Sequence, residues 1–256
     1  MAKPIKQRMA DGEQFNGCFV ELFSPIAAEI VCGAGYDSIM IDLEHGPGSY
    51  TDAVAMMQAA GQYGCMTLIR TSSASVTDIK RTMDIGPDGI MVPMVNTADQ
   101  AEQVVKSCHY APRGFRSSAK PIIRATGYGD RADDYERYLV EDFLLIVQIE
   151  SAEAADNVEA IAGVDGIDML FVGPYDLSCS LGIPGLFDDE LFNRTLERIE
   201  KAARDAGKLL GIIPIPGRDA ARQFANGHNL VITGTDTMLL KAAALDDVVN
   251  ANRSKI

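Results

Sequence analysis

Short apolar runs alternate with amphipathic stretches along the whole chain, and this alternation constrains the fold more than any other feature of the sequence. Each run is continuous and bounded by Gly, Pro or Asp, as expected for parallel strands buried on both faces. The predicted strands are Cys18–Phe23, Ser38–Ile41, Met66–Ile69, Gly89–Pro93, Phe143–Gln148, Met169–Val172, Leu209–Ile213 and Leu230–Thr233. The predicted helices between them are Pro25–Cys32, Tyr50–Tyr63, Val76–Met83, Thr97–Ser107, Ala152–Ile161, Asp189–Ala206 and Arg218–Asn226. Strands that alternate with helices in this way predict a (β/α)8 TIM barrel.

The length of 256 residues fits one such barrel as a single domain over residues 1–256. An open doubly wound sheet is the second choice, because no G-x-G-x-x-G follows the first predicted strand. The interval 108–142 interrupts the alternation and is rich in Arg, Gly and Asp. We expect it to cover the barrel mouth or reach a neighbouring subunit, with a surface excursion of no role as the alternative. Residues 237–250 are predicted to form a final helix.

Composition excludes several classes of protein. The net charge of −13 and the pI of about 4.6 disfavour a nucleic-acid partner, which would call for a basic surface. The five cysteines are odd in number and have no C-x-x-C spacing, so neither a zinc site nor a disulfide framework is expected. No apolar segment resembles a signal peptide or a membrane span, which predicts a cytoplasmic protein without a membrane partner.

Two acidic residues follow neighbouring predicted strands. Glu150 comes directly after the run that ends at Gln148, and Asp176 follows the next strand in the sequence GPYD. Because the carboxyl ends of adjacent parallel strands lie close together, both carboxylates can reach one cation. Oxygen ligands favour a hard divalent ion. The alternative is that each carboxylate caps a helix or pairs with an arginine.

Basic residues at two further strand ends complete a candidate site. His45 follows Asp42 and Glu44 and is a plausible general base, the alternative being a loop histidine satisfied by a neighbour. Arg70 can clamp a carboxylate or an enolate oxygen, or instead form an ion pair with Glu44 or Asp42. No predicted strand ends in Lys, and Lys120 is the one lysine expected near the mouth. A metal is therefore a better electron sink than a Schiff base.

Six blocks of the sequence match a known family. They are IDLEHGP (41–47), LIR (68–70), MDIGPDGIMVPMV (83–95), RATGYG (124–129), VQIE (147–150) and VGPYDLSCSLG (172–182). The chain resembles the HpcH/HpaI family of metal-dependent, class II pyruvate aldolases over nearly its whole length. The resemblance implies a (β/α)8 barrel whose last helix is exchanged between subunits of a homo-oligomer. That oligomer would be a hexamer built as a trimer of dimers.

The resemblance also implies roles for the residues of the predicted site. Glu150 and Asp176 would bind a divalent metal, Mg²⁺, Mn²⁺ or Co²⁺, and no organic cofactor would be needed. His45 would act as the base through water, and Asp84 would be the carboxylate that raises its basicity.

Substrate contacts are implied in the same way. Arg70 would stabilise the enolate and Gln148 would contact the substrate. The turn formed by Gly173, Pro174, Tyr175 and Asp176 would hold the oxo-acid carboxylate, through the backbone N–H groups of its last two residues.

The implied reaction cleaves a 4-hydroxy-2-oxo acid to pyruvate and an aldehyde through a metal-bound pyruvate enolate, as in aromatic or sugar-acid catabolism. Two positions depart from the family pattern: GFRSSAK (114–120) replaces a glycine-rich loop of many members, and Tyr175 stands where a small residue is common. The resemblance therefore does not identify the aldehyde that the reaction releases. Related enolate chemistry is the alternative: oxaloacetate decarboxylation, a citrate- or macrophomate-type condensation, or CoA-ester cleavage. A silent barrel that binds a small carboxylate or serves as a scaffold is a third reading.

Overall fold

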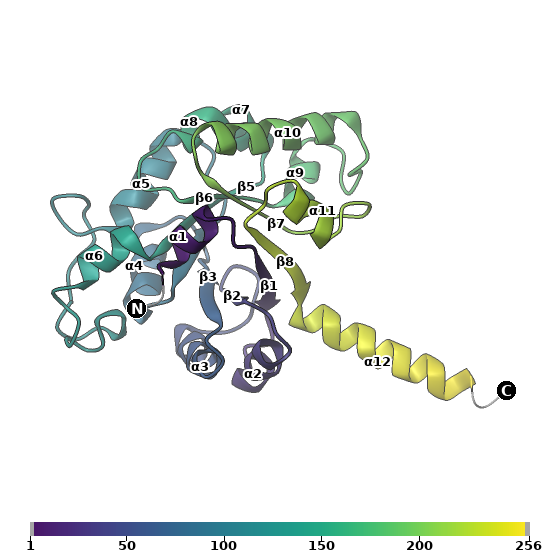
Figure 1. Cartoon of the computed structure of the whole chain (residues 1–256), viewed down its shortest axis with the longest axis horizontal. Helices are drawn as coiled ribbons and strands as arrows, with labels where there is room; N and C mark the ends of the chain where they lie inside the picture. Colours follow the sequence, from purple (N-terminus) through teal and green to yellow (C-terminus); the bar gives the residue numbers. More distant parts are fainter. Residues whose placement is uncertain (1–2, 254–256) are drawn as a thin grey trace.

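A computed structural model describes residues 3–253, in which eight strands close into a parallel barrel in sequence order (Figure 1). The strands are β1 (Phe15–Val20), β2 (Ser38–Asp42), β3 (Met66–Arg70), β4 (Gly89–Val92), β5 (Leu144–Ile149), β6 (Met169–Val172), β7 (Leu209–Ile212) and β8 (Leu230–Thr235). The last strand, β8, pairs in parallel with β1 and closes the barrel. The predicted fold class is confirmed, and exchange of the last helix stays a prediction.

Helices surround the barrel, and most of them lie between successive strands (Figure 1). They are α2 (Pro25–Gly33), α3 (Tyr50–Gly61), α4 (Val76–Ile85), α5 (Ala98–Cys108), α7 (Ala152–Asp156), α8 (Val158–Ala162), α9 (Pro174–Ser180), α10 (Glu190–Asp205) and α11 (Ala220–Ala225). The interval between β4 and β5 adds η1 (Arg124–Thr126) and α6 (Tyr135–Glu141), and α1 (Ile5–Ala10) precedes the barrel.

The loops at the carboxyl ends of the strands are fixed by side-chain caps. Ser24, Ser49, Ser75, Thr97 and Ser151 each accept a backbone N–H in the first turn of the helix that follows. Such a cap satisfies one of the N–H groups that a helix start leaves without a partner. The caps therefore set where each helix begins, and with it the length of each loop at the mouth.

One end of the barrel is closed by apolar side chains. Phe19, Met40, Leu68 and Phe171 belong to the cluster that fills the interior, and the same cluster contains Met9 of α1. The carbonyl of Met9 accepts a hydrogen bond from Asn229 Nδ2 at 3.1 Å, which ties α1 to the segment before β8. Because α1 packs at the amino ends of the strands, the opposite end is available for chemistry.

Several predicted boundaries were wrong. The first strand was predicted over Cys18–Phe23 but runs from Phe15 to Val20. It cannot include Phe23, because Phe23 has φ 49°, a left-handed conformation that strands do not accommodate. The backbone N–H of Glu21 donates to Asp236 Oδ1 at 2.9 Å instead of to a neighbouring strand. The predicted helix Ala152–Ile161 is two helices, α7 and α8, that meet at Asn157.

The interval 108–142 packs along the outside of α4 and α5. Arg124 Nη1 donates to the carbonyl of Ile85 at 2.6 Å, and the N–H of Phe115 donates to the carbonyl of Lys106 at 3.0 Å. Both acceptors lie near the carboxyl ends of their helices, which point away from the mouth. Lys120 pairs with Glu136 of α6 at 2.6 Å. These contacts do not agree with the expectation that the interval covers the barrel mouth and brings Lys120 to it.

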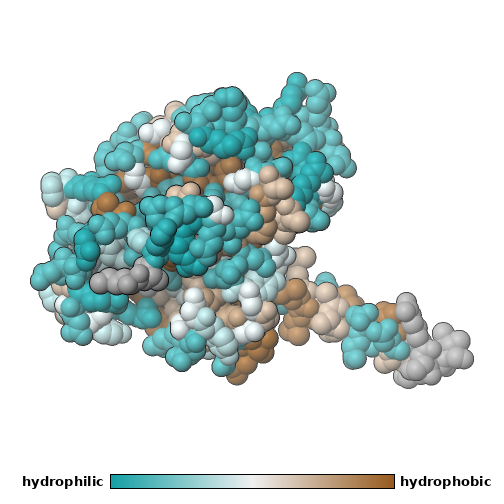
Figure 2. All heavy atoms as spheres, in the orientation of Figure 1, coloured by the Kyte–Doolittle hydropathy of each residue, from teal (hydrophilic) through white to brown (hydrophobic). Residues whose placement is uncertain are grey.

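The final helix, α12 (Asp236–Arg253), leaves the barrel (Figure 1). Met238, Leu240, Leu245 and Val248 are each more than half exposed. Figure 2 shows apolar surface along this helix. Among the described helices, none is both long and apolar enough to span a lipid bilayer.

Candidate active site

The strand ends place the predicted site residues at one end of the barrel. Asp42 ends β2, Arg70 ends β3, and Glu150 follows β5 directly. Gly173 follows β6, and Asp176 lies in the first turn of α9. All these strands are parallel, so their carboxyl ends meet at the same mouth.

Arg70 is held by acidic side chains of the neighbouring strand and loop. Asp42 and Arg70 are register partners in the β2–β3 pair, and both are buried. The guanidinium makes a two-pronged bond, with Nε 2.8 Å from Asp42 Oδ1 and Nη2 2.6 Å from Asp42 Oδ2. Glu44 Oε2 lies 3.3 Å from Nε. The ion pair offered as the alternative for Arg70 is therefore present, and it leaves the Nη1 edge of the guanidinium for another acceptor.

Glu150 is a buried carboxylate with two donors. It is 4% exposed, and its Oε1 accepts the backbone N–H of Met94 at 2.8 Å. Its Oε2 accepts a hydrogen bond from Gln148 Nε2. Burial raises the pKa of Glu150 to about 7, and the nearby carboxylates of Glu44 and Asp176 add to the shift. A cation placed beside Glu150 would offset this concentration of negative charge.

The β6–α9 turn passes very close to Glu150. A Cβ at Gly173 would lie 2.8 Å from Gln148 Nε2 and 2.9 Å from Glu150 Cβ, so glycine is required there. The turn leads directly into α9, whose first turn contains Tyr175 and Asp176. Backbone N–H groups in the first turn of a helix have no acceptor within that helix. They are available to an anion at the mouth.

His45 stands at the edge of the site on a loop that Asp42 and Phe23 shape. The His45 side chain is 66% exposed, and Nε2 lies 3.9 Å from Glu44 Oε2. Asp42 Oδ1 accepts the N–H groups of Glu44 at 3.0 Å and of His45 at 3.4 Å. A Cβ at Gly46 or Gly48 would collide with the Phe23 ring. The sequence GPG therefore lets the His45 loop pack onto Phe23, in the segment that follows β1.

Asp84 is not brought to the mouth of its own chain. It lies near the carboxyl end of α4, which runs away from the mouth after β3. Its Oδ1 accepts a hydrogen bond at 2.6 Å from Arg116 Nη2, and the Arg116 side chain is fully buried. The structure therefore separates Asp84 from His45 within one chain and gives it a partner in the interval 108–142.

Sequence reasoning missed Met94 and the role of Phe23. Both are non-glycine residues with positive φ, 55° for Met94 and 49° for Phe23, and both follow a strand that ends at the mouth. The turn at Met94 aims its N–H at Glu150, while its side chain is half exposed. No pattern in the sequence identifies these residues, because backbone conformation at such a turn is set by the packing around it.

The acidic side chains at the mouth have the oxygen atoms that a divalent metal requires as ligands. Glu150 and Asp176 present carboxylate oxygens near neighbouring strand ends, and each is within electrostatic reach of the other. Within residues 3–253, no three His, Cys, Asp or Glu side chains gather closely enough to hold a metal by themselves. A site with two protein carboxylates leaves its other positions to substrate and water, as is usual for a hard cation that activates a ligand.

Comparisons with known proteins agree over the full barrel. The family model for HpcH/HpaI aldolase/citrate lyase matches residues 16–243. The 2-keto-3-deoxy-L-rhamnonate aldolase of Shigella dysenteriae serotype 1 is 37% identical over 243 residues, which are 95% of this chain and 91% of the relative. The hydroxypyruvate/pyruvate aldolase of Chromohalobacter salexigens is 37% identical over 245 residues, 96% of each chain. The crystal structure of an HpcH/HpaI aldolase/citrate lyase family protein from Burkholderia cenocepacia J2315 superimposes with a TM-score of 0.88 at 32% identity, covering 97% of this chain and 98% of that one.

Proposed function

The chain belongs to the HpcH/HpaI aldolase/citrate lyase family, and we propose that it cleaves a 4-hydroxy-2-oxo acid to pyruvate and an aldehyde with the help of a divalent metal. Its relatives are named as aldolases, so the chain is a carbon–carbon lyase. The observation that carries the proposal is the buried Glu150 carboxylate. It is fixed by Met94 and Gln148 and lies beside Glu44, Asp176 and Arg70 at the barrel mouth.

Glu150 and Asp176 are the proposed metal ligands, and Mg²⁺, Mn²⁺ or Co²⁺ suits their oxygen atoms. When bound, the metal would polarise the keto group of the oxo acid as a Lewis acid. The N–H groups of Tyr175 and Asp176, at the start of α9, would hold the substrate carboxylate. Gln148 Oε1 is buried and has no partner among the described residues, which supports a contact between this amide and the substrate.

The chain's own residues then move the proton and stabilise the charge. His45, acting through water, accepts the proton of the 4-hydroxyl group. The C4–O bond becomes the carbonyl of the aldehyde as the C3–C4 bond breaks. The electron pair of that bond forms the C2–C3 double bond, and the π pair of the C2 keto group moves onto its oxygen to give the enolate. The edge of Arg70 that Asp42 leaves free would stabilise the developing oxyanion. Protonation at C3 releases pyruvate.

Asp84 and the oligomer belong to the same proposal. Asp84 is remote from His45 in its own chain, so a role in raising the basicity of His45 requires the Asp84 of a second copy. The exposed apolar side chains of α12, such as Leu240 and Leu245, support a homo-oligomer that covers this helix. A hexamer with exchanged last helices remains our proposal from the resemblance, and a cytoplasmic location stays a prediction.

The test is pyruvate release from a panel of 4-hydroxy-2-oxo acids, including 2-keto-3-deoxy-L-rhamnonate, before and after EDTA and after add-back of each metal. We expect EDTA to abolish release and one metal to restore it. Glu150→Gln and Asp176→Asn should lose this metal-dependent release, while Glu153→Gln, an exposed acid on α7, should keep it. Release that persists in EDTA and in both site variants would contradict the proposal.

Related enolate chemistry is the second candidate, because the matching family model includes citrate lyase. Oxaloacetate decarboxylation and condensation reactions need the same enolate, and oxaloacetate belongs in the panel. The acids Asp42, Glu44, Glu150 and Asp176 outnumber Arg70 at the mouth, which disfavours the phosphates of a CoA ester. Tight metal binding without aldehyde release from any panel member would shift the assignment to condensation or CoA-ester cleavage.

A further inference from the structure

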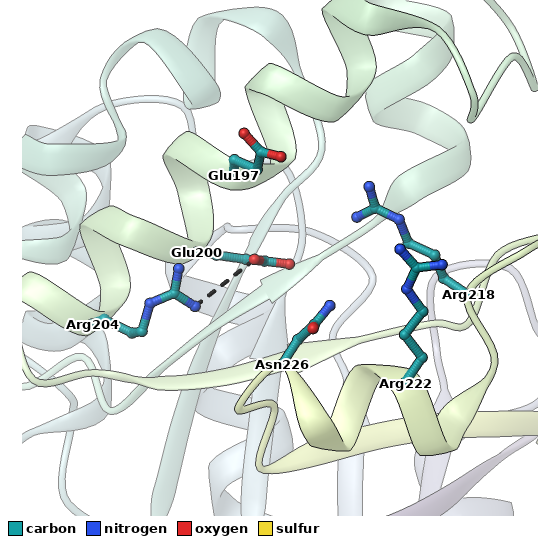
Figure 3. A pocket seen from close by; sticks show the side chains of 6 residues that line it. All are labelled: Glu197, Glu200, Arg204, Arg218, Arg222 and Asn226. Carbon is teal, nitrogen blue, oxygen red and sulfur yellow. Dashed lines mark ion pairs between the residues drawn. The ribbon is translucent and has the colours of Figure 1, made fainter.

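A groove lies on the outside of the barrel, between α10 and α11. It has a volume of about 440 Å³ and is lined by Glu197, Glu200, Arg204, Arg218, Arg222 and Asn226 (Figure 3). These helices flank β7, Arg218 belongs to the loop that leads from β7 to α11, and none of the lining residues is among the candidate active-site residues. The groove is therefore separate from the candidate active site.

Arginine side chains dominate one side of this groove. Arg218 Nη2 donates to Asn193 Oδ1, and Arg222 Nη1 donates to the carbonyl of Gly217 at 3.1 Å, so both partners are neutral. Among the described residues, no carboxylate lies within 4 Å of either guanidinium. Figure 3 shows the two guanidinium groups next to each other on the right of the groove. Neighbouring positive charges repel, and an anion between them would relieve the repulsion.

The floor of the groove holds a buried acid. Glu200 is 6% exposed, its Oε2 lies 3.8 Å from Arg204 Nη1, and its Oε1 has no hydrogen-bond partner among the described residues. Figure 3 shows the Glu200 carboxylate between Arg204 on one side and the other two arginines on the opposite side. Burial raises the pKa of the Glu200 carboxyl. In its protonated form this carboxyl can donate a hydrogen bond to an oxyanion.

Further buried polar atoms lie behind Glu200. His228 Nε2 is 3.8 Å from Glu200 Oε1, and both polar atoms of the Gln223 amide are buried. None of these three atoms has a hydrogen-bond partner among the described residues. Buried polar atoms without partners are costly and uncommon in folded proteins, so Glu200 Oε1 and His228 Nε2, which lie 3.8 Å apart and both lack a partner, mark a position for polar contacts.

We propose that the groove between α10 and α11 binds the oxyanion group of a small metabolite, a phosphoryl or a carboxylate group, with Arg218 and Arg222 as its main ligands. Guanidinium groups match both oxyanions in geometry. The chain as a whole carries a net charge of −13, while three arginines face two glutamates in this groove. The positive groove is thus a local feature that general surface charge does not explain.

The test is calorimetric titration of the full chain with inorganic phosphate and, separately, with malonate, at an ionic strength held constant with chloride. The probe that binds more tightly identifies the oxyanion. Arg222→Gln should weaken its binding by about tenfold or more, because a charge-assisted hydrogen bond is lost. Arg194→Gln is the matched control: it removes the same charge from an exposed position on α10 that does not line the groove.

Glu200→Gln provides a second readout. The glutamine amide carries no negative charge and can donate a hydrogen bond, so this variant should bind the anion as tightly as the unaltered chain or more tightly. Absence of binding by both probes would overturn the proposal, and so would equal weakening by Arg222→Gln and Arg194→Gln. A fall in oligomer mass on Arg222→Gln, without a change in anion affinity, would instead identify the groove as a contact between copies of the chain.

Discussion

Asp42 holds Arg70 through both of its carboxylate oxygens, across a pair of strands in which the two residues are register partners. The same carboxylate accepts the N–H groups of Glu44 and His45. One buried acid therefore fixes both the proposed oxyanion donor and the loop of the proposed base. Arg70 also lies over the Phe19 ring, with its guanidinium carbon 4.7 Å from the ring centroid. The guanidinium is thus oriented before any substrate arrives.

Asp42→Asn should damage both stability and turnover. It removes the two-pronged carboxylate partner of a buried arginine and leaves only the longer contact with Glu44, and loss of one partner of a buried pair costs about 3–5 kcal/mol. It also frees Arg70 to turn away from the oxyanion, so kcat should fall by roughly a hundredfold or more. Urea denaturation and pyruvate-release kinetics measure the two effects. Glu44→Gln, which removes a longer contact of 3.3 Å, should cost less of both; equal losses would contradict the assignment to Asp42.

Glu150→Gln should stabilise the metal-free protein at high pH while it abolishes turnover. Burial raises the pKa of Glu150 from 4.5 to about 7, so the folded state favours the protonated carboxyl. The folded protein therefore loses stability as the pH rises from about 4.5 through 7, by up to about 3 kcal/mol. Glu150→Gln has no titrating carboxyl at this position, so its free energy of unfolding does not fall in this way. The difference in free energy of unfolding between the variant and the unaltered chain should therefore grow across that pH range and stay constant above it.

Urea denaturation in EDTA, at several pH values between 4.5 and 8, measures this difference. Saturating divalent metal should remove the advantage of Glu150→Gln, because the metal stabilises only the chain that binds it. A difference between the two proteins that does not change with pH would show that Glu150 titrates as an exposed carboxyl does.

The backbone of Met94 should matter more than its side chain for Glu150. Asn adopts positive φ readily, so Met94→Asn should keep the N–H that donates to Glu150 and leave metal affinity unchanged. Val is strained at positive φ, so Met94→Val should lower stability by about 1–2 kcal/mol and weaken metal binding. Calorimetric titration with Mn²⁺ compares the two variants. Equal affinities would mean that this N–H does not position the carboxylate.

Gly48→Ala should lower activity through the His45 loop. Its Cβ would collide with the Phe23 ring, and relief of such overpacking costs about 1–3 kcal/mol and moves the loop. Pyruvate-release kinetics and thermal unfolding measure the change. Phe23→Ala in the same chain makes room for the new methyl group, so the double variant should be less impaired than the sum of its single variants. Additive losses would show that Phe23 and Gly48 act independently.

The sequence alone determined the barrel and most of its mouth. Apolar runs bounded by turn residues predicted all eight strands, because the hydrophobic pattern and the turn chemistry are local properties of the chain. The position of Glu150 and Asp176 after adjacent strands predicted that they would lie near each other, since parallel strand ends converge. The ion pair of Arg70 with Asp42 was already among the alternatives.

Only the tertiary structure decided which atoms meet. In the folded chain, the N–H of Met94 donates to Glu150, and Asp42 binds one edge of the Arg70 guanidinium. Asp84 lies near the carboxyl end of α4, where it accepts a hydrogen bond from Arg116. The tertiary structure also gathers Arg218, Arg222 and Glu200 around one groove. These relations depend on backbone conformation at turns and on contacts between distant segments. Both arise when the whole core packs, and no local pattern of residues encodes them.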